Sequence, residues 1–139
     1  MRLFIGAETM LVPQEQGRPV GGGWIEWKRK KFLTDSYWTS PDIRAAITDL
    51  GMDVIVFVPD AIVGVCVERE FDFRWEQAET IEDRAEVCRR IQPLGSFVWL
   101  DKFDSTEWTR DEDDVLLIDV AGHIRRLHLK NVRDWLLKG

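Results

Sequence analysis

A long run of alternating side chains, residues 63–75, constrains the fold more than any other feature of this sequence. Side chains of a β-strand point alternately to the two faces of a sheet, so apolar residues at every second position indicate a strand with one buried face. We therefore expect one bent strand or two successive strands here. Pro59-Asp60 would turn a buried strand at 53–58 into this run as a hairpin. The apolar positions include Val63, Val65, Val67, Phe71, Phe73 and Trp75.

The rest of the pattern predicts about three helices and several short strands. Ser40-Pro41 is typical of a helix start, and Gly51 ends that helix. Thr80 with Asp83 begins a second helix, and Asn131 begins a short third one. Further strands are expected at 3–5, 9–12, 24–33 and 97–100, and a hairpin joins 115–120 to 124–129. The sequence thus predicts a single α+β domain over residues 1–139, with a mainly antiparallel sheet.

The length of 139 residues is enough for a hydrophobic core without a metal or a disulfide. No apolar stretch is long enough to cross a bilayer, so no membrane association is expected. Cys66 and Cys88 both lie inside apolar patterns, which favours two reduced, packed thiols in a cytoplasmic protein. A disulfide between these two cysteines is the alternative.

The residue inventory favours binding over catalysis. Seven tryptophans stand beside only two histidines and two cysteines, and tryptophan supplies apolar area rather than acid–base chemistry. His123 and His128 have opposite strand parity, so they are not expected to share a metal. The sequence also lacks a Gly-x-Ser-x-Gly nucleophile turn. We therefore predict no catalytic residue, no metal site and no cofactor.

The excess negative charge is confined to one stretch of the chain. Residues 101–119 contain eight acidic and two basic residues, a net charge of −6, which equals the net charge of the whole protein. Within that stretch, residues 101–114, here called the acidic segment, read as a loop. Trp108 lies in this segment among charged neighbours and outside any apolar periodicity. An aromatic side chain surrounded by charge is typical of a protein-binding hot spot.

The tryptophans and the charge together predict a protein-binding module. Parity assigns Trp75, Trp99 and Trp135 to the core, which leaves Trp108 as the favoured anchor. Negative charge would steer the module to a basic macromolecular partner, as an inhibitor, immunity protein or counter-defence factor would require. The predicted partner-binding residues are Trp108, Asp101, Asp104, Asp111, Glu112, Asp113 and Asp114.

Two alternative functions use other chemistry. The carboxylates of residues 101–114 offer oxygen ligands to a divalent cation, which would make the chain a small metal-dependent enzyme. The strand at 24–32 interleaves aromatic and basic side chains, among them Trp24, Lys28 and Lys30. Such a strand can stack nucleic-acid bases and neutralise phosphates. The overall acidic balance argues against general nucleic-acid affinity.

Overall fold

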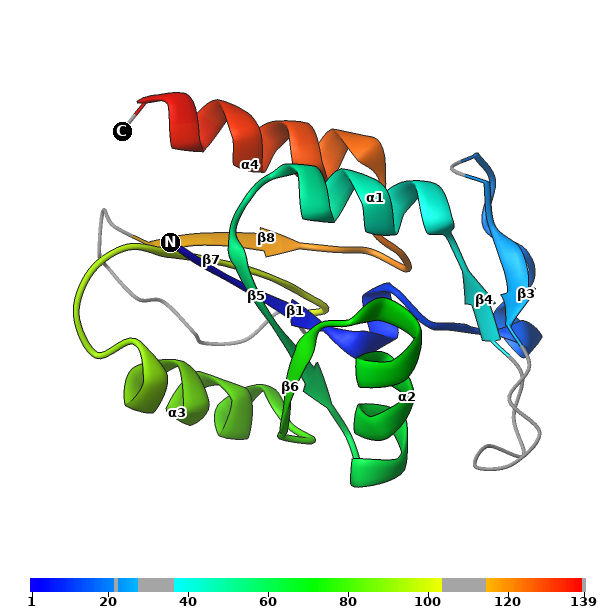
Figure 1. Ribbon diagram of the computed structural model, residues 1–139, viewed down its shortest axis with the longest axis horizontal. Helices are drawn as coiled ribbons and strands as arrows, with labels where there is room; N and C mark the ends of the chain where they lie inside the picture. Colours follow the sequence, from blue (N-terminus) through cyan, green and yellow to red (C-terminus); the bar gives the residue numbers. More distant parts are fainter. Residues whose placement is uncertain (22, 28–36, 104–114, 139) are drawn as a thin grey trace.

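A five-stranded parallel sheet forms the centre of the molecule (Figure 1). The computed structural model describes residues 1–21, 23–27, 37–103 and 115–138. Across the sheet the spatial order is β6-β5-β1-β7-β8, and every neighbouring pair is parallel. Its strands are β1 (Arg2–Gly6), β5 (Asp53–Val58), β6 (Arg74–Gln77), β7 (Phe97–Asp101) and β8 (Val115–Asp119).

Four helices and a small second sheet accompany the parallel sheet. The small sheet is antiparallel and consists of β2 (Val12–Pro13), β4 (Tyr37–Thr39) and β3 (Ile25–Trp27), in that order. The helices are α1 (Pro41–Asp49), α2 (Ala61–Phe71), α3 (Ile81–Ile91) and α4 (Arg126–Lys138). Helices α1 and α4 lie side by side on one side of the parallel sheet, and α3 lies on the other (Figure 1).

Both faces of the sheet are covered, which makes two layers of core. On one face, alternate residues of β1, β5 and β7, such as Leu3 and Val56, pack against α1, α2 and α4. On the other face, Phe4, Phe57 and Trp99 pack with α3. Strands with two buried faces are near-continuous apolar runs, as the fully buried Leu3, Phe4 and Ile5 of β1 illustrate. The molecule is therefore an α/β protein with a doubly wound sheet.

The predicted α+β class with a mainly antiparallel sheet is wrong. The antiparallel strands form only the small second sheet, and the five-stranded sheet is parallel throughout. Parallel neighbours require a crossover connection, whereas antiparallel neighbours can be joined by a short hairpin. The error therefore comes from assigning hairpins where the chain makes crossovers.

The run at 63–75 is the first of these errors. Residues 61–71 form helix α2, and only the end of the run belongs to strand β6. The Asp60 side chain accepts a hydrogen bond from the Val63 amide at 2.9 Å, so Pro59-Asp60 begins a helix instead of turning a hairpin. Val63, Val67 and Phe71 are spaced by four residues and are all buried, so a helical stripe was present beneath the alternation. Helix α2 is the crossover that makes β6 parallel to β5.

The predicted hairpin at 115–129 is the second error. Its first strand exists as β8, but β8 pairs in parallel with β7. The second predicted strand is largely the first turn of α4, which begins at Arg126, well before the Asn131 start expected from the sequence. Buried Leu129 and Val132 lie three residues apart and belong to the apolar face of this helix.

The described tryptophan and cysteine side chains lie within the core or at its edge. Trp99 is fully buried, as predicted, whereas Trp75 and Trp135 are only partly buried at the edge of the core. Cys66 and Cys88 are buried, are not joined in a disulfide, and lie on helices that pack on opposite faces of the sheet. The prediction of two packed thiols is confirmed, although Cys66 lies on a helix and not on a strand.

Candidate functional site

The order of the strands identifies a candidate binding position at the carboxyl ends of two neighbouring inner strands, β1 and β7. Counted along the chain, the five strands have the spatial order 3-2-1-4-5, so the chain first moves outward from β1 to one side and then crosses to the other. The direction reverses between β1 and β7. In doubly wound sheets, ligands bind in the crevice outside the carboxyl ends of the strands at this switch point. The residues that end β1 and β7 are Gly6 and Asp101.

Gly6 allows the Asp101 carboxylate to lie directly over the end of β1. A Cβ atom added at Gly6 would overlap the carboxylate of Asp101. No larger residue fits there unless Asp101 moves. Asp101 itself is held in place, because its carboxylate accepts hydrogen bonds from the Trp99 indole at 3.0 Å and the Lys102 amide at 2.8 Å.

Arg84 connects the two strand ends. One terminal guanidinium nitrogen donates to both Asp101 oxygens at 3.0 Å, and the other donates to both Glu8 oxygens at 2.6 and 3.1 Å. Its Nε donates to the Ala78 carbonyl at 2.9 Å. Only 3% of the Arg84 side chain is exposed, against 39% of the Glu8 side chain. Glu8, Arg84 and Asp101 therefore form a charged cluster that is buried at one end and open to solvent at the other.

Local sequence signals place the members of this cluster. Helix α3 begins at Thr80, whose hydroxyl accepts a hydrogen bond from the Asp83 amide at 3.1 Å. This start places Arg84 in the first turns, next to the apolar side of the helix. A short 3-10 helix, Ala7–Thr9, follows β1 directly, and the Thr9 hydroxyl donates to the Gly6 carbonyl at 2.8 Å. That turn carries Glu8 above the strand end.

The burial of these charges sets their electrostatics. Desolvation raises the pKa of Asp101, against the opposing effect of the Arg84 charge and the hydrogen bonds from Lys102 and Trp99. For Arg84, desolvation lowers the pKa, but the hydrogen bond to Glu8 and the charge of Asp101 outweigh it, so the net pKa is raised. The cluster thus contains one permanent positive charge between two carboxyl groups.

A pocket of about 450 Å³ opens beside the cluster. We call it the switch-point pocket. Its lining contains four carboxylates and two cationic side chains. The lining residues are Glu8, Glu79, Thr80, Ile81, Glu82, Arg84, Asp101 and Lys102.

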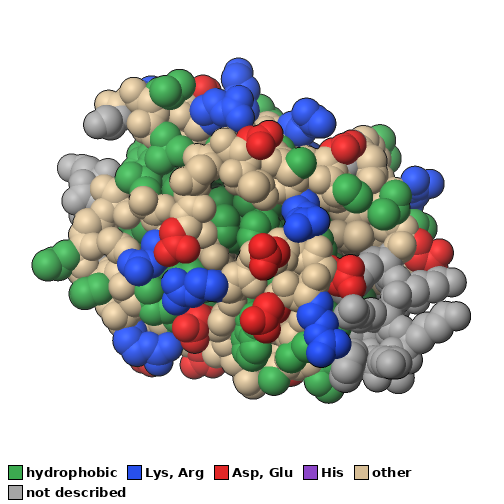
Figure 2. Space-filling view, in the orientation of Figure 1, with side chains coloured by type: hydrophobic (Ala, Val, Ile, Leu, Met, Phe, Trp, Pro, Cys, Tyr) green, Lys and Arg blue, Asp and Glu red, His purple; other side chains and the backbone are tan. Residues whose placement is uncertain are grey.

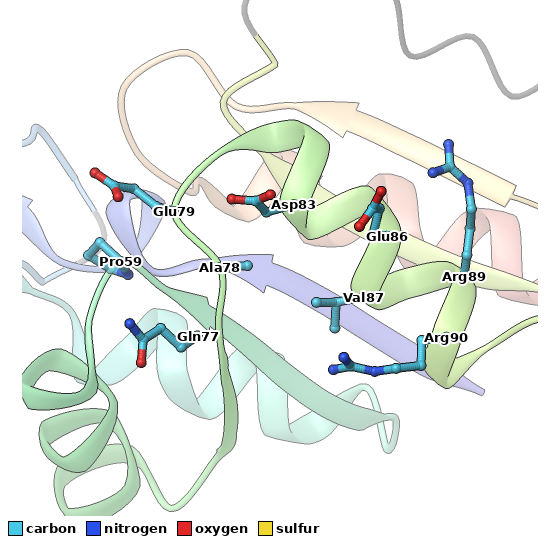
Figure 3. A pocket seen from close by; sticks show the side chains of 9 residues that line it. All are labelled: Pro59, Gln77, Ala78, Glu79, Asp83, Glu86, Val87, Arg89 and Arg90. Atoms are coloured by element: carbon cyan, nitrogen blue, oxygen red, sulfur yellow. The ribbon is translucent and has the colours of Figure 1, made fainter.

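A broader, open groove continues from the switch-point pocket along α3, and Glu79 belongs to both. In Figure 3 Glu79 lies at one end of this groove, and Asp83 and Glu86 follow it along α3. Arg89 and Arg90 lie toward the other end, so charged side chains of both signs line the groove.

The predicted partner-binding residues fall largely outside the described residues. Of the seven, only Asp101 is described, and its carboxylate is buried in the cluster with Arg84. Trp108, Asp104, Asp111, Glu112, Asp113 and Asp114 lie in the part of the chain that the structure does not describe. On the face shown in Figure 2, acidic and basic side chains are intermixed among the coloured residues. The partner-binding prediction stays a prediction.

Trp24, one of the residues of the predicted nucleic-acid-binding strand at 24–32, is buried. Trp24 is 2% exposed, and its carbonyl accepts two hydrogen bonds from the Arg18 guanidinium, at 3.0 and 2.7 Å. A buried indole cannot stack on a base, so Trp24 does not serve the role that the sequence suggested. Lys28 and Lys30 lie outside the described residues.

Glu8 and Arg84 were missed by the sequence reasoning, although each carried a signal. Arg84 lies three residues after Ile81 and next to Ala85, so it interrupts the apolar side of a predicted helix with a charge. Glu8 follows a short apolar strand and Gly6, the pattern of a strand that ends at a polar site. Neither signal identifies the partner, because the residues that meet here are 76 and 17 positions apart in the chain.

The fold and the site define a doubly wound α/β protein with a polar crevice at its switch point. Comparison with protein-family models, curated proteins and solved structures found no match. None of the described helices is both long enough and apolar enough to cross a membrane. Across the described ranges, no three His, Cys, Asp or Glu side chains are grouped so that they could hold a metal ion.

Proposed function

We propose that this protein binds a small polar molecule in the switch-point pocket. The observation that carries the proposal is the position of Glu8, whose partly exposed carboxylate is fixed by buried Arg84 at the place where the strand order reverses. A side chain held in one orientation loses little conformational entropy on binding, which favours affinity. The pocket size of about 450 Å³ suits a small ligand.

The charges of the pocket define the chemistry of this ligand. Arg84 is shared between Glu8 and Asp101, so the cluster keeps a net charge of −1 when both carboxyl groups are ionised. Glu79 and Glu82 add two further carboxylates, and Lys102 adds one positive charge. Ionised carboxylates only accept hydrogen bonds. The preferred ligand therefore presents donors, as hydroxyl or ammonium groups.

Thermal unfolding with four probe compounds tests this proposal. Ribose and 1,4-diaminobutane supply donors, whereas citrate and inorganic phosphate supply negative charge. A donor compound at about 100 times its Kd is expected to stabilise the protein by about 2.7 kcal/mol, which raises Tm by roughly 5–10 °C. Citrate and phosphate are expected to have no specific effect, because they meet like charges.

Matched glutamate variants assign the effect to the site. Glu8→Gln removes the charge at constant size and is expected to abolish most of the shift, whereas Glu15→Gln, on an exposed residue after β2, leaves it unchanged. The proposal fails if neither donor compound raises Tm, if only the anions do, or if Glu8→Gln responds as the parent does.

The acidic segment supports a second candidate function, binding to a basic protein partner as an inhibitor or immunity protein would. Residues 101–119 carry the net charge of the whole chain. Asp101 and Val115, the described residues that bracket the segment in β7 and β8, lie at opposite ends of their strands. Asp101 pairs with Asp119 at the carboxyl ends, and Val115 pairs with Phe97 at the amino ends. An excess of negative charge in one segment favours association with a basic partner.

For this second candidate, Trp108→Ala is expected to weaken partner binding by about 2 kcal/mol or more. Replacing Asp104, Asp111, Asp113 and Asp114 by Asn is expected mainly to slow association and to reduce its salt dependence. A partner recovered by tagged pull-down allows both effects to be measured by surface plasmon resonance. Leu94→Ala and Asp134→Asn, at exposed sites elsewhere, serve as controls. Unchanged binding by both sets of segment variants would refute this candidate.

A further inference from the structure

A second pocket of opposite character lies beyond the carboxyl end of β8. It measures about 280 Å³ and lies between the loop that follows β8 and the first turn of α1. Its inner wall is apolar and consists of the buried side chains of Trp24, Ile43 and Ile124. Two further apolar side chains, Val20 and Leu127, stand exposed at its rim. The apolar surface open to a ligand therefore comes mainly from these two rim side chains, which can cover a body of about one ring.

Two arginines line the same pocket without a counter-charge. Arg125 and Arg126 are exposed, and neither forms an ion pair with any residue in the described part of the chain. They stand at the beginning of α4, whose first turn holds no acidic residue. Positive side chains at this end of a helix are repelled by the helix dipole. The pair therefore lowers the stability of the free protein, and an anion bound between the two side chains would relieve the repulsion.

His123 adds a polar group to the pocket. Its ring meets the Trp24 ring edge-on at 5.2 Å, and its Nε2 is buried with no hydrogen-bond partner among the described residues. Burial, followed by the charges of Arg125, His128 and Lys102, lowers the pKa of His123. Two acidic groups border this region. Asp42 lies beside Gly23, and Asp119 acts on His128, whose pKa is nevertheless lowered by burial and by Arg125.

We propose that this pocket binds a small organic anion, with its apolar body between the exposed side chains of Val20 and Leu127 and its anionic group at Arg125 and Arg126. The apolar side chains at the rim would contact the apolar body of such a ligand, and the two arginines would bind its anionic group. A guanidinium fork pairs with either a carboxylate or a phosphate. The site is separate from the switch-point pocket and shares no residue with it.

Calorimetry with four probes tests the two halves of the proposal. Phenyl phosphate and benzoate carry a ring and a charge, benzyl alcohol carries the ring alone, and inorganic phosphate carries the charge alone. We expect phenyl phosphate or benzoate to bind at least about tenfold more tightly than either half, and the tighter of the two identifies the anionic group. If inorganic phosphate or benzyl alcohol binds as tightly as the complete probes, or if no probe binds, the proposal is wrong.

Variants on one helix locate the binding. The double variant Arg125→Gln/Arg126→Gln is expected to lose about tenfold or more in affinity, while Arg133→Gln, further along the exposed side of α4, is unchanged. The free double variant is expected to have a higher Tm than the parent, because the repulsion at the helix start is gone. Binding equal to that of the parent would overturn the assignment.

A second pair of variants keeps the test independent of the arginines. Leu127→Ala removes apolar surface at the rim and is expected to weaken the ring-bearing probes about fourfold or more. Leu137→Ala, on another exposed residue of the same helix that does not line the pocket, is the control. Equal effects of these two substitutions would contradict the location of the site.

Discussion

Replacing Arg84 by methionine is expected to lower the free energy of unfolding by about 3–5 kcal/mol. The substitution removes the only side-chain cation within reach of buried Asp101 among the described residues, and it also releases Glu8. Methionine keeps the apolar stem of the arginine, so the loss reports the charge and not a cavity. Urea unfolding followed by tryptophan fluorescence measures the change as a shift of the transition midpoint.

An arginine on the same helix serves as the matched control. Arg90 is 68% exposed, and among the described residues it pairs with Glu76 alone, at 3.7 Å. Arg90→Met is therefore expected to cost less than about 1 kcal/mol. The double variant Arg84→Met/Asp101→Leu is expected to recover much of the loss, because removing both buried charges leaves none unpaired. A loss of equal size in the two arginine variants would show that the cluster does not stabilise the fold.

The Arg84→Met loss is also expected to depend on pH. Burial raises the pKa of Asp101, and the Arg84 charge opposes that rise. Without Arg84 the folded-state pKa of Asp101 rises further above its unfolded value, so folding favours the protonated carboxyl group. Stability of the variant is then retained at low pH and lost as pH rises through the folded-state pKa. The deficit relative to the parent should be larger near about pH 8 than near about pH 5.

Gly6→Ala is expected to lower the free energy of unfolding by about 3 kcal/mol. The new methyl group would overlap the Asp101 carboxylate, which cannot withdraw without breaking its hydrogen bonds to Arg84, Trp99 and Lys102. Thermal unfolding measures the loss. The same substitution should also remove ligand binding at the switch-point pocket, because a displaced Asp101 no longer holds Arg84 in position against Glu8.

A double-mutant cycle separates the overlap from other effects of the substitution. With Asp101→Ala already present there is no carboxylate to meet, so adding Gly6→Ala should cost far less than it does in the parent. Because glycine is the more flexible residue in the unfolded chain, the added alanine could even stabilise that background slightly. Additive losses in the cycle would rule out the close approach of Asp101 as the cause.

Individual elements were predictable where the signals are local. The limits of β5 follow from an apolar run ended by a proline, and α1 and α3 follow from their capping residues Ser40 and Thr80. A side chain that caps its own helix acts over three residues, so no tertiary information is needed. The strand prediction for residues 63–75 failed because the spacing of the valines is compatible both with a strand and with the apolar face of a helix. The Asp60 cap and packing on β5 and β6 favour the helix.

The candidate site was much less predictable than the elements. Asp101 was named from the sequence as part of an acidic surface, yet its carboxylate is buried beneath Arg84. In the sequence Asp101 precedes several acidic residues, but in the structure its carboxylate contacts Gly6 at the end of β1 and Arg84 of α3. The cause is the parallel topology, which brings strand ends together that are far apart in sequence.

By itself, the sequence determined that this chain has a hydrophobic core, where several of its helices and strands begin and end, and that its excess charge lies in residues 101–119. Only the tertiary structure decided that the sheet is parallel and that four residues meet at the carboxyl ends of β1 and β7, namely Gly6, Glu8, Arg84 and Asp101. Capping and periodicity act between near neighbours and can be read along the chain. Strand order and buried ion pairs depend on contacts between distant segments, which form only when the whole core is packed.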